Sequence, residues 1–297
     1  MNEASSGVKA RQSDAQRARI RLGVLLTTIS AIVFSTAGLF VRSVAADSWS
    51  IIFWRGLFAA TFTTIYVALR GSLRREFSRM GMSGVAVAAL GASATSAFIP
   101  SFQLTTIANV SLIYATAPFV AAGLAYLWFR ERPTRAVVAS SVLALLGVAV
   151  IVGASFGGLR LRGDALALTM TTLFSAMMVV YRRYPGTPAS GPVALSSLLL
   201  LLPAACLGAP FAVSTKDIGV LAAFGVVFAV ASVTLSEGAR RLPPGEAALL
   251  SALETPFAPL WAWLILAEAP APPTIVGGGL ILLAVLGSQL KALRRTG

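Results

Sequence analysis

Acidic side chains are few in the long apolar stretches of this sequence, and Glu254 lies near the middle of one of them. A charged side chain at the centre of a membrane-spanning helix costs about 3 kcal/mol or more unless it faces protein or water. Glu254 shares one helical face with Ser251 and Trp261, so we expect that face to look into a helix bundle. Glu254 could bind a substrate ammonium group or carry a proton, or it could be a structural carboxylate that caps a broken helix.

Two prolines occupy equivalent places in the two halves of the chain. Pro118 lies in the motif A-T-A-P-F-V and Pro256 lies in the motif L-E-T-P-F-A. Proline removes a backbone hydrogen bond and kinks a helix, and the carbonyl groups that it frees are tolerated at membrane depth where they line a cavity. We expect the two prolines to act as a pair of hinges; the alternative is that each is a passive packing kink.

Small polar and aromatic residues form stripes on two apolar segments that correspond to each other. Phe34 and Ser35 lie on the first segment, and Phe174, Ser175 and Met178 lie on the sixth. We expect these side chains to line a central cavity, although aromatic residues of membrane helices more often serve packing or interface anchoring. The other cavity candidates, besides Glu254, are polar residues of the third, fourth, eighth and ninth segments: Ser96, Asn109, Tyr114, Ser232 and Ser251.

Arg55 is the one cation that lies well inside an apolar segment. Arginine pairs bidentately with carboxylates, so Arg55 could bind that group on a ligand. It could equally extend its charged end to the nearer membrane surface, because it lies only a few residues from the end of its segment. The sequence leaves both interpretations open.

The sequence lacks the residues of the common catalytic and metal sites. It contains no histidine, which removes the commonest metal ligand and proton shuttle, and its single cysteine permits no disulfide framework. It also lacks the H-E-x-x-H, G-x-x-x-x-G-K-[ST] and G-x-S-x-G motifs. We therefore expect no metal, no cofactor and no enzymatic activity, and we rank a membrane enzyme acting on lipid or a glycosyl donor, and a scaffold or receptor, below a transporter.

The elements that must position these residues are membrane-spanning helices. Of the 297 residues, 57% are hydrophobic and only 12% are charged, whereas a soluble domain carries about 25% charged residues. A spanning helix needs about 20 mostly apolar residues. This pattern predicts an all-α integral membrane protein with ten transmembrane helices, at about 22–42, 49–69, 81–101, 106–129, 136–154, 163–183, 190–211, 217–237, 245–267 and 274–293.

The second five segments repeat the first five. The residues that align are Phe34 with Phe174, Ser35 with Ser175, Arg42 with Arg182, Pro118 with Pro256 and Phe119 with Phe257. Each half has five spans, an odd number, so the second half begins on the opposite side of the membrane and is inverted relative to the first. Such inverted repeats are typical of secondary transporters, whose substrate site lies near the bilayer midplane between the halves. We therefore predict a basket of two inverted five-helix repeats, 22–158 and 159–293, around a central cavity.

Most of the 24 lysines and arginines fall in the termini and in the loops on the same side of the predicted helices. The positive-inside rule accounts for this asymmetry, and it accounts for the net charge of +13 better than nucleic-acid binding does. It predicts that the 1–21 tail and the 294–297 tail are both cytoplasmic. The polar segment 1–21 lacks the apolar core of a signal peptide, and we expect it to be disordered.

Two long stretches resemble drug/metabolite transporters of the EamA type. They are A-N-V-S-L-I-Y-A-T-A-P-F-V-A-A-G-L-A-Y-L-W-F-R-E at 108–131 and R-R-L-P-P-G-E-A-A-L-L-S-A-L-E-T-P-F-A-P-L-W-A-W-L-I-L-A-E at 240–268. The family's proline-then-glutamate pattern is matched by Pro118 with Glu131 and by Pro256 with Glu268, and its arginine early in the second helix is matched by Arg55. The general layout is closest to YddG-like amino-acid exporters. The resemblance implies ten helices in two inverted repeats, a central cavity and export of small metabolites.

From these features we expect a multi-pass transporter of the bacterial inner membrane. Its substrate would be a small molecule, most readily an aromatic or other hydrophobic amino acid, exported by alternating access around the midplane cavity. A broad efflux transporter of drugs or cations is the alternative. The lipid bilayer is its environment, nucleic acid is not a partner, and the sequence leaves the choice between monomer and homodimer open.

Overall fold

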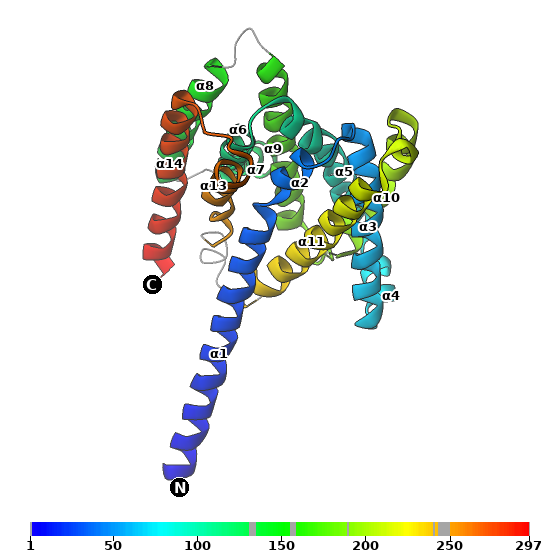
Figure 1. Cartoon of the computed structure of the whole chain (residues 1–297). Coiled ribbons are helices and arrows are strands. Elements are labelled where there is room, and N and C mark those ends of the chain that lie inside the picture. The colour runs from blue at the N-terminus through cyan, green and yellow to red at the C-terminus, as the bar shows by residue number, and fades with distance from the viewer. Residues whose placement is uncertain are drawn as a thin grey trace.

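Every secondary-structure element in the described part of the chain is a helix. The computed structural model describes residues 2–130, 135–154, 159–188, 190–239, 241–242 and 250–296. The helices, labelled in Figure 1, are α1 (Asn2–Phe34), α2 (Ala37–Arg42), α3 (Ser48–Leu69), α4 (Leu73–Ser78), α5 (Gly81–Leu104), α6 (Ile107–Tyr114), α7 (Ala117–Phe129), α8 (Arg135–Gly153), α9 (Leu159–Arg183), α10 (Ser190–Leu207), α11 (Thr215–Ala239), α13 (Glu254–Leu266) and α14 (Pro272–Thr296), with a short 3₁₀ helix at Pro210–Ala212.

The helices of the two halves of the chain are interleaved. Helix α1 packs along α11, and α5 packs along α9. Helix α3 packs between α10 and α11, and α8 packs along α14. Helices α6 and α7 contact α9, and α6 also contacts α13. Both chain ends lie on the same side of this bundle (Figure 1); we call the opposite side the distal end.

Among the described residues, seven helical stretches are long and apolar enough to cross a membrane. They are Gln16–Arg42, Ser48–Leu69, Gly81–Leu104, Ile107–Phe129, Arg160–Arg183, Ser190–Leu207 and Thr215–Leu235. Shorter apolar helices, Val137–Gly153 and Pro272–Gly287, and the 13 residues of α13 stand where the remaining three spans are predicted. Large apolar side chains such as Leu127, Leu202 and Leu283 are more than 60% exposed on this bundle, which suits contact with lipid.

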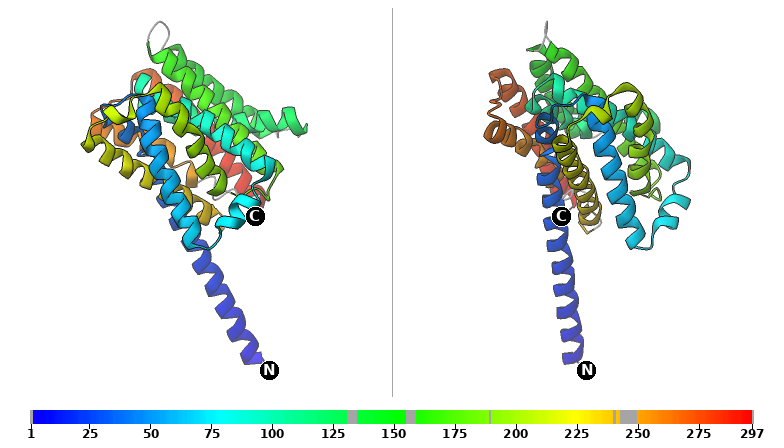
Figure 2. Two further views of the ribbon diagram at one scale, coloured as in Figure 1. Left: turned by 90° about the vertical axis from the view of Figure 1, so that its right-hand side faces the viewer. Right: turned by 45° about the vertical axis from the view of Figure 1, so that its right-hand side comes forward.

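The expectation of a disordered N-terminal tail is wrong. Helix α1 begins at Asn2 and runs without interruption to Phe34, so it extends well beyond the bundle (Figure 2). The tail contains no proline, and it is rich in alanine, arginine and glutamine, which are good helix formers. The tail therefore continues the helix of the first span.

Three of the predicted spans are interrupted among the described residues. The ninth span turns at Ala252 and Leu253 before α13, and the first and fourth spans are each broken into two helices. The first span turns at Ser35 and Thr36, between α1 and α2, and the fourth span turns at Ala115 and Thr116, between α6 and α7. The hydroxyls of Ser35 and Thr36 donate to the carbonyl groups three residues earlier, at 2.6 and 2.7 Å. Such local bonds compete with the helical ladder and help to end it. The corresponding sixth span, α9, is continuous.

Asp47 starts α3. Its carboxylate accepts hydrogen bonds from the backbone N–H groups of Trp49 and Ser50, at 2.9 and 3.0 Å, and from the Ser50 hydroxyl. Burial raises the pKa of Asp47, but these hydrogen bonds outweigh burial and lower the pKa below its ordinary value. The cap therefore stabilises the fold at neutral pH, and this contribution is lost as the pH falls through the lowered pKa.

Glycines let α8 and α14 come into close contact. A Cβ atom added at Gly147 would lie 2.5 Å from the carbonyl oxygen of Gly277, and a Cβ atom added at Gly277 would lie 2.5 Å from the carbonyl oxygen of Gly147. In lipid, where apolar burial does not drive helix association, such close packing is a main source of helix–helix stability.

We expect Gly277→Val to separate α8 from α14 and to lower the stability of the folded protein by about 1–3 kcal/mol, the usual cost of overpacking. Gly279→Val is the matched control, because it has the same change in helix propensity and a Cβ there meets nothing within 4 Å. Thermal unfolding of both variants in detergent measures the difference. Equal unfolding temperatures would contradict the close contact.

Candidate functional site

A small cavity lies where the broken helices meet. It is lined by residues of α5, α6 and the start of α13: Phe98, Phe102, Val110, Ser111, Tyr114, Glu254 and Thr255. Its volume is about 10 Å³ when measured by the centres of water-sized spheres. That is close to the space of one water molecule. The cavity is therefore closed around a polar centre in this conformation.

Glu254 is the acidic group of this cavity and the first residue of α13. The chain turns at Ala252 and Leu253 directly before it, so the carboxylate lies at a helix N-terminus, where a negative charge is favourable. It is half-buried, and among the described residues we find no hydrogen-bond donor for its carboxylate. The start of α13 thus positions the backbone of Glu254, and the carboxylate keeps its hydrogen-bonding capacity unused among the described residues.

Aromatic rings and hydroxyls surround this carboxylate. The ring of Tyr114 meets the ring of Phe174 edge-to-face at 5.9 Å, and Phe98 meets Phe102 at 4.8 Å. Ser111 and Thr255 add hydroxyl groups to the lining. Rings that present their faces attract a cation as well as apolar groups, so the cavity suits an ammonium group attached to an apolar body.

Each proline predicted to be a hinge stands just after a break. Pro118 follows the turn at Ala115 and Thr116 and lies in the first turn of α7, and Pro256 lies in the first turn of α13. Pro118 has no N–H to donate to the carbonyl group of Tyr114, four residues earlier. The two halves of the chain therefore have similar interruptions on both sides of the cavity.

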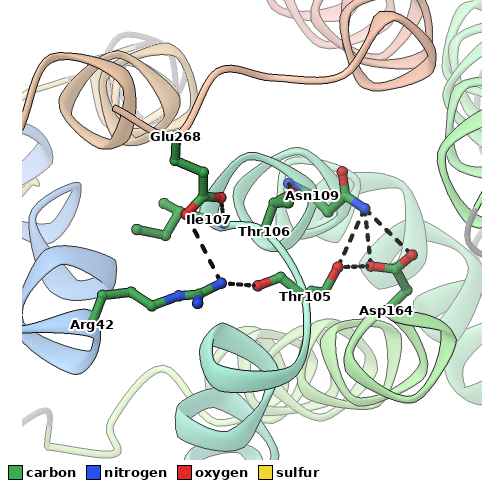
Figure 3. Close-up of polar contacts among 7 residues, drawn as sticks. All are labelled: Arg42, Thr105, Thr106, Ile107, Asn109, Asp164 and Glu268. Carbon is green, nitrogen blue, oxygen red and sulfur yellow. Dashed lines mark hydrogen bonds and ion pairs between the residues drawn. The ribbon is translucent and has the colours of Figure 1, made fainter. Parts of the chain in front are cut away.

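A polar network joins helix ends around the start of α6, and Figure 3 shows most of its side chains. Arg42, at the end of α2, donates from Nη2 to the carbonyl oxygen of Thr105 at 2.7 Å and lies 3.9 Å from the carboxylate of Glu268. The other oxygen of Glu268 accepts from the backbone N–H of Ile107 at 2.8 Å, at the start of α6. These contacts connect α2, the α5–α6 turn and the segment after α13.

Asp164 of α9 extends the network. It is fully buried and accepts hydrogen bonds from Thr105 Oγ1 at 2.7 Å and from Asn109 Nδ2 at 3.1 Å. The Asn109 side-chain oxygen accepts in turn from Thr274 Oγ1 of α14 at 2.8 Å. Gly163 permits this approach, because a Cβ there would lie 2.6 Å from the Thr105 nitrogen. We call Arg42, Thr105, Ile107, Asn109, Asp164, Glu268 and Thr274 the distal network.

The backbone before Glu268 is strained. Ala267 ends α13 with φ at 54°, in the left-handed region, while the N–H of Glu268 donates back to the carbonyl oxygen of Ala262. A non-glycine residue in that region costs about 1–3 kcal/mol and is retained where the surroundings require it. Here the strained residue directs Glu268 towards Ile107 and Arg42.

The distal network lies directly above the cavity along α6. Asn109 belongs to the network, and Ser111 and Tyr114 line the cavity two and five residues further along the same helix. At a rise of about 1.5 Å per residue, the two sites are less than about 8 Å apart along the helix axis. The network therefore lies within about two helical turns of the cavity.

Arg55 is buried inside the bundle, so the interpretation that it extends to the membrane surface is wrong. Its side chain is 2% exposed, and its guanidinium lies over the rings of Phe228 at 4.7 Å and Phe224 at 5.5 Å. Its Nε atom has no hydrogen-bond partner, and among the described residues no carboxylate forms an ion pair with it. Helix α11, which is distant in the sequence, covers the charge.

Several predicted cavity residues do gather around the break between α1 and α2. The hydroxyl of Ser35 accepts a hydrogen bond from Trp261 Nε1 of α13 at 3.0 Å. Phe34 meets Phe228 edge-to-face at 5.7 Å. Ser175 is fully buried and donates to the carbonyl oxygens of Ala117 and Thr171, so it joins α9 to α7 and does not face the cavity.

The other predicted site residues are not brought to the cavity. Asn109 is fully engaged in the distal network, and Ser96 bonds the carbonyl group of Ser93 in its own helix. Met178 is 44% exposed. Ser251 precedes the turn that starts α13, so it does not continue the helical face of Glu254. Ser232 is half-buried on α11 and does not line the cavity.

Sequence reasoning missed most of the distal network. Arg42 and Glu268 appear in the sequence only as members of the repeat and of the proline-then-glutamate pattern. Glu131, the partner of Pro118 in that pattern, lies outside the described residues. The roles of Thr105 and Asp164 could not be predicted from the sequence, because polar residues are expected at the ends of membrane spans.

Comparisons with known proteins agree with this architecture. The sequence profile of the EamA-like transporter family matches residues 21–153 and again residues 161–289. A solved structure described only as "Crystal structure of protein" aligns with a TM-score of 0.64 and 18% sequence identity, over 93% of this chain and 99% of its own. At that identity the likeness shows the fold alone. No protein of curated function matches the sequence, and nothing in these comparisons supports the narrower resemblance to YddG-like exporters.

Proposed function

The chain belongs to the EamA-like transporter family, and we propose that it exports small metabolites, most readily aromatic and other hydrophobic amino acids, by alternating access around the Glu254 cavity. The observation that carries the proposal is the pair of broken helices on both sides of that cavity. Discontinuous helices at the interface of two repeats are typical of substrate sites in secondary transporters.

In this proposal the cavity residues divide the recognition of an amino acid between them. Glu254 pairs with the ammonium group, and the freed backbone carbonyl groups beside Pro118 add acceptors. The rings of Phe98, Tyr114 and Phe174 contact the apolar side chain. The cavity of the described conformation is smaller than any amino acid, so in this proposal the cavity must widen to take up its substrate.

The ten-helix inverted repeat remains part of the proposal, and the helix packing supports it. If the spans of the first half correspond in order to those of the second, α1 on α11 is the counterpart of α9 on α5. Likewise, the packing of α3 on α11 corresponds to the packing of α10 on α5. The pairs α3 with α10 and α8 with α14 each join two corresponding spans, so the exchange of the halves leaves them unchanged. A two-fold relation between the halves would produce these exchanged pairs.

The orientation follows from the distribution of charge. The positive-inside rule puts both termini in the cytoplasm, so the distal network closes the outer side. The protein would then be a multi-pass protein of the bacterial inner membrane, and export would require the network to open.

Transport by purified protein in proteoliposomes tests the proposal. Labelled phenylalanine, tryptophan, threonine and methyl viologen are offered with and without a pH gradient. We expect saturable transport of the two aromatic amino acids that unlabelled phenylalanine competes away. Folded protein that moves none of the four solutes would contradict the proposed function.

Broad efflux of organic cations is the second candidate, and the lining of the cavity favours it. A lone carboxylate among aromatic rings binds a cation whether or not the ligand also carries a carboxylate. Transport of methyl viologen without transport of the amino acids would select this candidate in the same assay.

The hinge proposal makes a separate prediction. Combining Pro118→Ala with Pro256→Ala allows two further backbone hydrogen bonds, at about 1 kcal/mol each. We expect these bonds to straighten the helices and to change the ratio of inward-facing to outward-facing protein by about thirtyfold. Labelling of single cysteines from each side of the membrane measures the bias. Pro203→Ala in the unbroken helix α10 is the control, and labelling of the double variant that matches wild type on both sides would contradict the hinge role.

A further inference from the structure

Arg55 is a buried cation without an anion. The side chain is 2% exposed, its Nε atom lacks a hydrogen-bond partner, and the described residues supply no carboxylate to it. A charge removed from water in this way is costly unless it is paired. Such a residue is retained in a membrane protein where it serves an ion or a ligand.

The contacts that Arg55 does make compensate it only in part. Phe224 and Phe228 are one turn apart on α11, and the guanidinium lies over both rings. Each cation–π contact offsets part of the cost of burying the charge, but it leaves the N–H donors of the guanidinium unused. A planar fork of donors with no acceptor is complementary to a carboxylate.

A chain of contacts connects Arg55 with the transport cavity. Phe228 rests against Phe34, which is the last residue of α1. The next residue, Ser35, lies in the break and accepts the hydrogen bond from Trp261. Trp261 stacks on Phe257 of α13, the helix that Glu254 begins. Movement at the break between α1 and α2 would therefore displace Phe228, one of the two rings that cover Arg55.

We infer that Arg55 is a carboxylate-binding subsite of the transport path, and that it takes monocarboxylates joined to an apolar or aromatic group. One guanidinium neutralises one negative charge, and the rings of Phe224 and Phe228 supply apolar surface beside it. The inference rests on the proposed function. It adds that the carrier distinguishes solutes that bear a carboxylate from amines that lack one.

Equilibrium binding to the purified full-length protein tests the subsite without any transport step. The probe is 3-phenylpropionate, and its neutral isostere 3-phenylpropionamide is the matched ligand. We expect the acid to bind wild-type protein about tenfold more tightly than the amide, as a charge-assisted hydrogen bond supplies. Arg55→Gln should remove this preference. Arg70→Gln should keep it, because Arg70 lies just after the end of the same helix and is paired with Glu237.

Stability separates a binding role from a structural one. Because Arg55→Gln removes an unpaired buried charge, we expect the ligand-free variant to unfold at no lower a temperature than wild type. The inference would be overturned if wild-type protein bound the acid and the amide with equal affinity. It would also be overturned if inorganic phosphate displaced 3-phenylpropionate as well as unlabelled 3-phenylpropionate does, or if ligand-free Arg55→Gln were markedly destabilised. If Arg55→Gln does not fold, Arg55→Lys decides, because it keeps the charge and should keep part of the preference. Acid-selective binding by a protein that transports nothing would retain the subsite and refute the exporter.

Discussion

We expect Glu254→Gln to lower the rate of the proposed amino-acid export by about ten- to hundredfold and to leave the fold intact. The carboxylate begins α13, faces a cavity of hydroxyls and aromatic rings, and has no donor from the described residues. Its loss removes a charge-assisted bond to the substrate ammonium group, which contributes about 1.5–3 kcal/mol. Initial rates in proteoliposomes measure the loss, and the unfolding temperature reports the fold.

The control for this change is Asp217→Asn, which converts a carboxylate to an amide near the start of α11. Asp217 bonds Ser214 and does not line the cavity, so its replacement should leave the export rate unchanged. If Glu254→Gln transports at the wild-type rate, Glu254 is a structural carboxylate and the substrate ammonium group binds elsewhere.

We expect Glu268→Ala to open the entrance that the distal network is proposed to close. The variant loses the hydrogen bond from the Ile107 N–H and the ion pair with Arg42. The hydrogen bond to a charged group contributes about 1.5–3 kcal/mol and the partly exposed ion pair at most about 1 kcal/mol. We therefore expect the open population to rise about ten- to several hundredfold.

A cysteine in the cavity reports this opening. Ser111→Cys places a thiol of similar size in the cavity lining, and Cys206→Ser removes the native cysteine. An impermeant maleimide applied from the outer side should label this cysteine much faster when Glu268 is alanine. Glu76→Ala is the matched control, because Glu76 accepts backbone N–H groups of Ser190 and Gly191 near the start of α10. Faster labelling in that control, or no change in Glu268→Ala, would contradict a distal gate.

The cavity could be predicted in part because its signals are local in the sequence. A carboxylate and two prolines in apolar segments are unusual wherever they occur, and the structure puts Glu254, Pro118 and Pro256 at the helix breaks. The break at Ser35 could not be predicted in the same way. Serine and threonine are common inside membrane helices, and only the loss of the helical ladder distinguishes this pair.

The distal network could not be predicted because it consists of contacts between distant residues. Arg42 and Glu268 are each ordinary at the end of a span, and their relation appears only when α2 and the end of α13 meet at α6. Asn109 is a second example. Its polar side chain predicts a place in the cavity lining, but in the structure it bonds Asp164, which lies in the second half of the chain. The burial of Arg55 could not be predicted either, because the helix that covers it, α11, is distant in the sequence.

Protection of the Ser111→Cys thiol by a transported solute tests the central claim most directly. The claim is that solute occupies the Glu254 cavity between the broken helices. In the Cys206→Ser background, a saturating concentration of the solute that proteoliposomes transport should slow the labelling of this cysteine by about tenfold or more, and Glu254→Gln should abolish the protection. A labelling rate that stays the same at saturating solute would put the transport path elsewhere and contradict the account.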